Sequence, residues 1–378
     1  MTYLFGNRAD ETYTYRRVDW DTWQEGADIG DVVNGSVELS AFSDLKAACR
    51  FDYVGTEAPE QDSLVRIYYS FTDDYGDRAE YMVGTFIVCY ASNANIADYE
   101  GSECVGMRVS GSADGYSVLK VLADRIYGMP FTVNAGQQPV QVAASLMGGL
   151  GLRVDVQDES SYALKSDYTF EPDDSYLTIV NWCMSAAGFA AVSPDPSGTV
   201  VVKRYVDPTS RAPVATFAND DESIMYPEVE EENDWQSTPN VVRAFYSTED
   251  VAIYAYARNL RGSKASLESR GGRELTLFEN VSELDGSTSA QMLSNLKAHA
   301  KAKLLDNSAE IERVRLSHPY VPIFPNDPIR IEYADRTWSG SVTNITVSLE
   351  PSTRCDTEIR RFVPNTITTD DGGAVLWG

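Results

Sequence analysis

Runs of apolar and β-branched residues, broken by short polar turns, dominate the first 115 residues and predict strands. Residues 64–71 are rich in Val, Ile, Tyr and Phe, and residues 81–90 carry a similar run after the turn at residues 73–77. We expect these two runs to pair as a hairpin. Three shorter strands are predicted at residues 35–40, 49–54 and 104–110. This pattern favours a small β-barrel or sandwich.

The hydrophobic spacing changes to a helical period in the middle of the chain. Apolar residues recur at spacings of one, three and four over residues 117–128, which predicts a helix there. A second helix is predicted over residues 139–147. A third begins after Asp174 or Ser175, either of which can cap its first amides, and Gly188 is placed to end it. A hairpin is expected to follow.

The second half returns to strands around one long helix. Residues 287–306 place Leu293, Leu296, Ala300 and Leu304 on one face, which predicts an amphipathic helix with a cap near Ser287 or Ser289. Strands are predicted at residues 240–246, 252–258, 311–317, 328–333, 338–349 and 357–363. The carboxylate-rich stretch 219–235 is predicted to be a solvated linker.

Together these elements predict an α+β fold that is mostly β. The expected domains are a first β domain (1–115), a small α/β domain (116–205), a second β domain carrying the helix of residues 287–306 (206–364) and a flexible C-terminal tail (365–378). No tandem repeat of 20 to 50 residues is visible, so solenoids and propellers are disfavoured.

The net charge of the chain disfavours two classes of partner, nucleic acid and anionic lipid. Its 31 Lys and Arg stand against 57 Asp and Glu, a formal net charge of −26 over 378 residues. A surface with this excess of carboxylates repels nucleic acid and anionic lipid. The longest apolar run, residues 251–257, is far shorter than the roughly 20 residues that cross a bilayer, so no membrane insertion is expected.

Cysteine usage and the start of the chain indicate the compartment. The five cysteines are widely spaced, with no CxxC pair, which fits reduced thiols rather than a zinc site or redox dithiol. The first residues have no basic leader followed by a long apolar run. We therefore expect a soluble protein made in a cytoplasm.

The sequence yields no catalytic, cofactor or metal residue. His299 and His318 are the only side chains that titrate near neutrality without perturbation, and neither is set in a catalytic motif. Residues 219–235 have carboxylates for calcium but lack the spacing of a calcium loop. Two alternatives stay open: paired carboxylates could make a hydrolase, and the 22 tyrosines and 6 tryptophans could make a carbohydrate-binding face.

The order of several segments resembles the hub proteins of bacteriophage tails. These segments are residues 83–88, the strand that ends near Asp114 with the following 116–122, residues 175–189, 195–198, 200–205, 239–243, 323–331, 342–349 and 359–362. Each is weakly specific alone, and the resemblance lies in their order and spacing over residues 30–363. The family includes long-tail hubs, contractile-tail baseplate hubs and the VgrG spike of type VI secretion.

The resemblance implies an architecture and a set of partners. It implies two similar β-barrels flanking the α/β domain, so that a homotrimer forms a ring of six barrels that meets the sixfold tail tube. Implied partners are the tail-tube or distal tail protein on one side and a spike, fibre or receptor-binding protein on the other. The implied place is the virion tail tip, after assembly in the bacterial cytoplasm, and the implied role is structural rather than enzymatic.

Two further expectations follow from the resemblance. Carboxylates lining the central channel would let DNA pass through the lumen without binding. About 15 residues follow the last predicted strand, so no lytic or cell-binding module is expected after it.

Overall fold

The computed structural model describes most of the chain and divides it into two compact units. It describes residues 8–73, 75–100, 102–204, 206, 211–220, 225–233, 236–248, 250–281, 284, 288–308, 310–363 and 368–377. Unit 1 comprises Met1–Val229 with Arg315–Ile359, and unit 2 comprises Glu230–Val314 with Arg360–Gly378. The fold is α+β and mostly β, as predicted. The division cuts through the predicted second β domain, because its late strands join unit 1.

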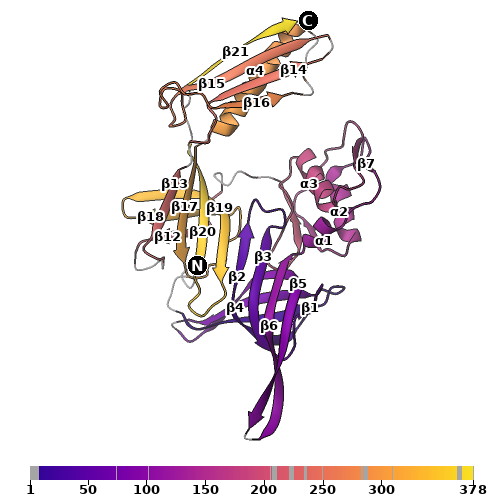
Figure 1. The fold of residues 1–378 in the computed structure, drawn as a ribbon, viewed down its shortest axis with the longest axis vertical. Helices are drawn as coiled ribbons and strands as arrows, with labels where there is room; N and C mark the ends of the chain where they lie inside the picture. Colours follow the sequence, from indigo (N-terminus) through magenta and orange to yellow (C-terminus); the bar gives the residue numbers. More distant parts are fainter. Residues whose placement is uncertain are drawn as a thin grey trace. The chain divides into compact units, whose positions relative to one another are not determined.

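Six strands of unit 1 form a closed ring of pairings. They are β1 (Ala9–Val18), β2 (Glu25–Ser40), β3 (Ala47–Gly55), β4 (Leu64–Thr72), β5 (Arg78–Glu100) and β6 (Glu103–Ser117). Their order is β1-β4-β5-β6-β3-β2, and β1 also pairs with β2, which closes the ring (Figure 1). The predicted hairpin of residues 64–71 and 81–90 is the antiparallel β4–β5 pair.

Aromatic side chains fill the inside of the ring. Tyr15, Phe51 and Tyr53 are buried, with ring centroids 5.6 to 6.2 Å apart. A close approach at Gly55 makes room for them, since a Cβ there would lie 2.1 Å from Ile29 O and 2.9 Å from the Tyr15 hydroxyl. The alternation of strand residues thus gives this ring a packed core rather than a channel.

The α/β part of unit 1 follows the ring directly. Its elements are α1 (Lys120–Asp124), β7 (Phe131–Val133), α2 (Pro139–Gly149), β8 (Val154–Val156), β9 (Tyr168–Phe170), α3 (Tyr176–Ala186), β10 (Ser193–Pro194) and β11 (Val200–Val202). As expected, the Ser175 hydroxyl accepts a hydrogen bond from Thr178 N at 3.1 Å, and Gly188 has a φ of +72°. The helix predicted over 117–128 is much shorter, because Arg125 is extended and Ile126 forms a β-bridge with Ser175.

Six later strands continue the same twelve-stranded sheet. They are β12 (Ala215–Ala218), β13 (Val229–Asn233), β17 (Glu310–His318), β18 (Pro328–Tyr333), β19 (Arg336–Ser348) and β20 (Cys355–Val363). They run in the order β12-β18-β19-β20-β17-β13, and β19 pairs with β2 of the closed ring. The predicted linker 219–235 is therefore wrong over Val229–Asn233, which is strand; residues 221–224, 234 and 235 lie outside the described residues.

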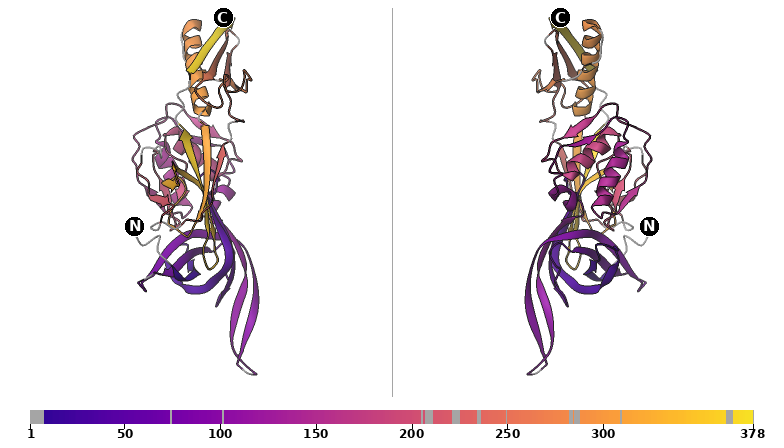
Figure 2. Two further views of the ribbon diagram at one scale, coloured as in Figure 1. Left: turned by 90° about the vertical axis from the view of Figure 1, so that its left-hand side faces the viewer. Right: turned by 90° about the vertical axis from the view of Figure 1, so that its right-hand side faces the viewer.

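Unit 2 is a four-stranded sheet covered on one face by a helix. Its elements are β14 (Val241–Ser247), β15 (Ala252–Arg261), β16 (Thr276–Asn280), α4 (Ser289–Ser308) and β21 (Thr368–Trp377), with strand order β16-β14-β15-β21 (Figure 2). Leu296, Ala300 and Leu304 of α4 pack on the alanine-rich face of β14 and β15, as the predicted stripe required. The candidate cap Ser287 lies outside the described residues.

Residues 368–377 of the predicted flexible tail (365–378) form the strand β21, whereas residues 365–367 and 378 lie outside the described residues. Thr368–Trp377 pairs antiparallel with β15, and the Asp370 carboxylate accepts a hydrogen bond from the Arg258 guanidinium. A Cβ at Gly373 would lie 2.4 Å from Tyr254 O, so the glycine lets β21 approach its neighbour closely. Gly372 and Gly373 thus permit tight strand packing in this segment.

No helix in the part of the chain that the structure describes is long and apolar enough to cross a membrane.

Candidate functional site

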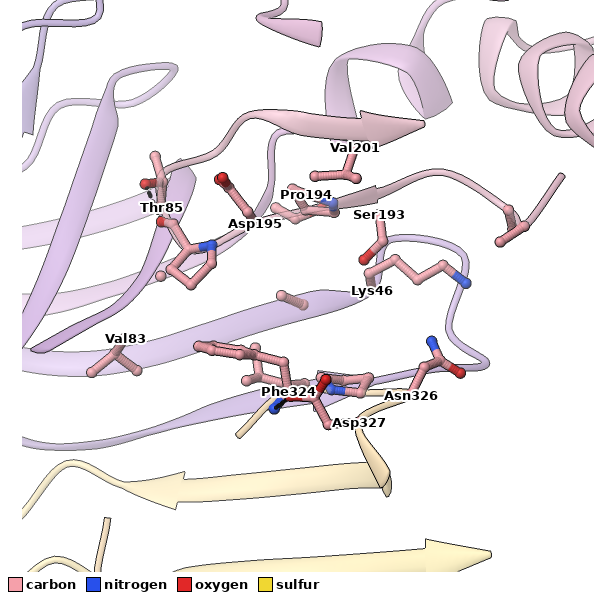
Figure 3. Close-up of a pocket in the computed structure, with 18 of the residues that line it drawn as sticks. Lys46, Val83, Thr85, Ser193, Pro194, Asp195, Val201, Phe324, Asn326 and Asp327 are labelled. Atoms are coloured by element: carbon pink, nitrogen blue, oxygen red, sulfur yellow. Dashed lines mark hydrogen bonds between the residues drawn. The ribbon is translucent and has the colours of Figure 1, made fainter. Parts of the chain in front are cut away.

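A cavity of about 240 Å³ lies in unit 1 where three segments meet. The closed ring contributes the β2–β3 turn and β5, the α/β part contributes residues 190–203, and the loop at residues 324–327 closes the third side (Figure 3). Val83, Phe86, Val201 and Phe324 make much of its wall, and Lys46, Ser193, Asn326 and Asp327 supply polar groups. Most of the wall is apolar, which is usual for a ligand-binding cavity.

A buried arginine holds the turn that forms one wall of the cavity. Arg66 is 5% exposed, and its guanidinium donates to Ser197 O at 2.8 Å, to Thr85 Oγ1 at 3.1 Å and to the Glu25 carboxylate. The Thr85 hydroxyl in turn donates to Pro196 O at 2.7 Å. These bonds tie the turn at residues 194–199 to the closed ring.

The same turn depends on a glycine. Gly198 has a φ of +85°, in the region that favours glycine, and a Cβ there would lie 2.8 Å from Trp23 Cζ3. The hairpin expected after the third helix includes this turn, but nothing in the sequence indicated that the turn packs on the ring.

Two charged side chains of the cavity are affected by burial. Lys46 is half-buried; its ammonium donates to Ala41 O at 2.8 Å, and desolvation lowers its pKa. Desolvation raises the pKa of Asp327, and this is partly opposed by a hydrogen bond from Phe324 N at 2.9 Å and by the charges of Arg211 and Lys203. The cavity therefore contains both a cation and an anion that have lost part of their hydration.

The lining residues do not assemble a recognisable catalytic group. The described residues that line the cavity include neither histidine nor cysteine. The hydrolase alternative requires two available carboxylates, but Asp195 already accepts hydrogen bonds from Ser197 Oγ at 2.6 Å and Thr199 N at 3.0 Å. Asp195 acts as the cap of its own turn, which leaves Asp327 as the other carboxylate of the cavity.

The two histidines are found in different environments. His318, in unit 1, is fully buried, with Nδ1 2.6 Å from Pro319 O and Nε2 2.8 Å from Thr357 Oγ1. Because a carbonyl can only accept, Nδ1 donates and Nε2 accepts from the threonine. Burial lowers the pKa of His318 to about 4. His299, in unit 2, lies 3.3 Å from the Glu279 carboxylate and is 40% exposed.

Metal and redox sites receive no support from the described residues. Among them, no three His, Cys, Asp or Glu side chains are grouped in a way that could hold a metal ion. All five cysteines are free thiols, and burial raises the pKa of Cys49, Cys183 and Cys355. These three thiols are core side chains.

A two-stranded ribbon extends from the closed ring. Beyond Val109, the last β6 residue that pairs with β3, the strands β5 and β6 pair only with each other among the described strands (Figure 2). Met107 lies on the same side of β6 as the buried Ala113, because side chains alternate and no bulge interrupts residues 106–113. Met107 is nevertheless 62% exposed. One face of the ribbon is thus continuous with the core-facing side of the ring. This face extends past the core of the ring, where it is exposed.

The sheet of unit 2 has an aromatic face opposite α4. Phe245, Tyr254 and Tyr256 lie on this face, with ring centroids 5.0 Å (Phe245–Tyr254) and 6.1 Å (Tyr254–Tyr256) apart. Phe278 of β16 lies on the same face and is 66% exposed. Large exposed aromatic side chains are typical of interaction surfaces.

Known structures match the chain over nearly its whole length. A crystal structure of a tail protein from Neisseria meningitidis has a TM-score of 0.62 at 13% identity and covers 93% of this chain and 97% of that one. A 43 kDa tail protein of prophage MuSo2 from Shewanella oneidensis has a TM-score of 0.60 at 13% identity, covering 92% and 98%. No family model and no curated protein sequence matches the chain.

The class of fold follows from these two matches. The chain has the fold of these two tail proteins, one of them from a prophage, and this agrees with the resemblance seen in the order of its sequence segments. At 13% identity the likeness concerns the fold, and it assigns no role to individual residues.

Sequence reasoning missed the residues that build the cavity. Lys46 lies in a short turn with no recognisable motif. Asp327 falls within a segment that contributed to the family resemblance, residues 323–331, but nothing marked it as buried. The run of residues 64–71 did place Arg66 in a strand, and a charged residue within this apolar run was the one available signal; the structure shows that the strand is buried.

Proposed function

We propose that this protein is a structural hub of a phage or prophage tail that assembles as a homotrimer with pseudo-sixfold symmetry. The observation that carries the proposal is the division of the large sheet into two sets of six strands joined through β2 and β19. One set closes on itself through β1 and β2.

The hub requires the second set, β12-β18-β19-β20-β17-β13, to act as a barrel equivalent to the first. Three chains would then present six similar barrels around an axis, which allows a threefold assembly to meet a sixfold tube. The match of nearly the whole chain to two tail proteins supports this architecture.

The proposed partners follow from that position in a tail. One face of the ring would bind the tail-tube or distal tail protein, and the other a spike, fibre or receptor-binding protein. The protein would reside at the virion tail tip after assembly in the host cytoplasm, with DNA passing through an acidic lumen. Its role would be structural and not enzymatic.

Light scattering and native mass spectrometry between 1 and 100 µM test the trimer. We expect a species of about 125 kDa, three times the 41.7 kDa chain, that dissociates on dilution. Electron microscopy of that species should show six similar densities around a central channel. A 41.7 kDa monomer at every concentration, or a ring without six similar densities, would contradict the hub.

The aromatic face of unit 2 favours a second candidate function, binding of a neutral carbohydrate. Exposed rings such as Phe278 stack on sugars, and the Arg243–Glu274 pair at 3.1 Å places hydrogen-bonding groups of zero net charge beside them. A glycan array with wild-type protein and Phe278→Ala separates the functions. Binding that is lost in the variant supports the carbohydrate module, and no binding by either protein rejects it.

A further inference from the structure

The cavity of unit 1 has the shape and wall of a site for a small apolar molecule. Its volume of about 240 Å³ lies just below the roughly 300–1,000 Å³ of cavities that hold drug-sized ligands, so the fitting ligand is smaller. The wall is formed by Val83, Phe86, Pro194, Val201 and Phe324. Burial of an apolar body against these side chains would be favourable by the hydrophobic effect.

Lys46 is a cation in this cavity without a carboxylate partner. Among the described residues no carboxylate oxygen lies within 4 Å of its ammonium, which donates to Ala41 O and feels Asp44 only at longer range. Partial burial of an ammonium group without a counterion costs free energy. A ligand carboxylate at this position would offset that cost.

The other charges of the cavity already have partners or compensation. Asp195 caps its own turn through Ser197 and Thr199. Asp327 accepts from Phe324 N and is compensated by the charges of Lys203 and Arg211. Lys203, the other cation that lines the cavity, is exposed and acts on Asp327, so among the described lining residues Lys46 is the partly buried cation with no carboxylate within 4 Å, in a chain whose net charge is −26.

We propose that this cavity binds a small monocarboxylate with an aliphatic body, whose carboxylate pairs with Lys46. Figure 3 shows Lys46, Ser193 and Asn326 at one end of the cavity and Val83 at the other. The carboxylate would sit at the Lys46 end, where the hydroxyl and the amide supply further donors, and the aliphatic body would extend toward Val83. The proposal concerns unit 1 alone and does not depend on the assembly of the hub.

A pair of ligands with the same aliphatic chain, one ending in a carboxylate and the other in an uncharged hydroxyl, tests the site. Octanoate and octanol, titrated by calorimetry into the full-length protein at pH 7, have the same aliphatic body. We expect octanoate to bind at least about tenfold more tightly, which corresponds to about 1.4 kcal/mol. Lys46→Gln should abolish this preference and leave octanol binding unchanged, whereas Lys46→Arg should keep it.

Lys165→Gln is the matched control, because it removes the same charge from an exposed position of unit 1 that does not line the cavity. It should keep the wild-type preference for octanoate. Circular dichroism of each variant establishes that it is folded. Equal binding of octanoate and octanol by the wild type, a preference that survives Lys46→Gln, or no binding of either ligand at 2 mM would overturn the proposal.

Discussion

Arg66 shows how one buried polar residue connects two parts of unit 1 that are far apart in sequence. It belongs to a strand of the closed ring, yet it reaches Ser197 in the α/β part and Glu25 in β2. A guanidinium supplies five donors in a rigid plane, so it can bond several acceptors of different segments at once. The packing of the α/β part against the ring therefore rests on a polar network as well as on apolar contact.

Replacing Arg66 should destabilise unit 1. Arg66→Met keeps the aliphatic volume but leaves Ser197 O without this donor and leaves the Glu25 carboxylate with only the Tyr68 hydroxyl and Arg16 at 3.6 Å; breaking a buried pair costs roughly 3–5 kcal/mol. We expect the free energy of unfolding, measured in urea, to fall by about 3 kcal/mol. This is the lower end of that range, because the Glu25 side chain is 26% exposed. Arg50→Met, which removes an exposed arginine 3.7 Å from Asp114, should change the free energy by less than about 0.5 kcal/mol. Equal losses would show that the Arg66 network contributes nothing specific.

His318 should make the stability of unit 1 depend on pH in the acid range. Its folded pKa is lowered to about 4 by burial, so the unfolded state, near its ordinary value of 6.5, binds more protons between these two values. The contribution of His318 to the free energy of unfolding is fully present above about pH 6.5. It falls by about 3 kcal/mol as the pH decreases to 4. The charged groups that face His318 include Arg8, which opposes its protonation, and Asp356, which favours it.

Urea unfolding at pH 7.0 and pH 4.5 measures the pH-dependent contribution of His318 to the free energy of unfolding. His318→Gln should show a smaller loss of stability between the two pH values than the wild type, whatever its stability at pH 7.0. Lys165→Gln, a substitution at an exposed position of unit 1 outside the cavity, should keep the wild-type loss. Identical pH dependence of all three proteins would show that His318 does not supply the term.

At the scale of elements, the ribbon of β5 and β6 is the part of unit 1 least able to stay folded by its own contacts. Two strands alone are marginally stable in water, and this pair carries exposed apolar side chains on both faces. Met107 faces the side that continues the core of the ring, and Ile96 faces the opposite side because it pairs with Arg108. In the proposed trimer we expect the core-continuing face to be covered by a second copy.

Two matched substitutions distinguish the faces of the ribbon. Met107 is 62% exposed and Ile96 is 42% exposed in the isolated chain, so replacing either by Ser should leave the monomer folded. Met107→Ser should weaken each contact about tenfold, the effect of losing about 1.5 kcal/mol of apolar burial, and should lower the trimer association constant measured by light scattering roughly a thousandfold, because a closed trimer has three such contacts. Ile96→Ser should leave it unchanged. If both variants assemble like the wild type, the ribbon lies outside the contacts between copies.

Sequence periodicity predicted those elements whose stability comes from local signals. The helix after Ser175 has a cap, an apolar stripe and a glycine stop, and the hairpin of β4 and β5 has dense β-branched strands around a turn. The strand of residues 368–377 was missed because Asp-Asp-Gly-Gly is a turn signal unless a partner strand is available. Its partner, β15, lies more than 100 residues earlier in the chain.

The cavity could not be predicted, for a related reason. Its walls come from the β2–β3 turn, the segment 190–203 and the loop 324–327, which only the tertiary fold brings together. Lys46 has a positive φ of 63°, and the backbone bonds of its turn, not a motif, position it there. Local sequence carries no information about which of the 31 basic residues becomes partly buried without a carboxylate beside it when the chain folds.

At the scale of the whole molecule, net charge would decide how the proposed hub meets DNA. A chain of −26 becomes −78 in the proposed trimer, and duplex DNA carries one charge per roughly 1.7 Å of its axis. At 10 mM salt the Debye length is about 30 Å, so repulsion extends across a channel of molecular size. At 150 mM it is about 8 Å, and only carboxylates that line the channel itself would still act on the duplex.

Fluorescence anisotropy of a labelled 20-base-pair duplex therefore tests the acidic lumen in two steps. We expect no binding at 10, 50 or 150 mM salt with the protein at up to 50 µM, because repulsion should weaken with salt without turning into attraction. Binding that is tight at 10 mM and lost at 150 mM would reveal a cluster of cations that releases counterions from the duplex. Such a cluster would have to overcome the excess of carboxylates locally, and a lumen lined by it would slow the passage of DNA rather than permit it.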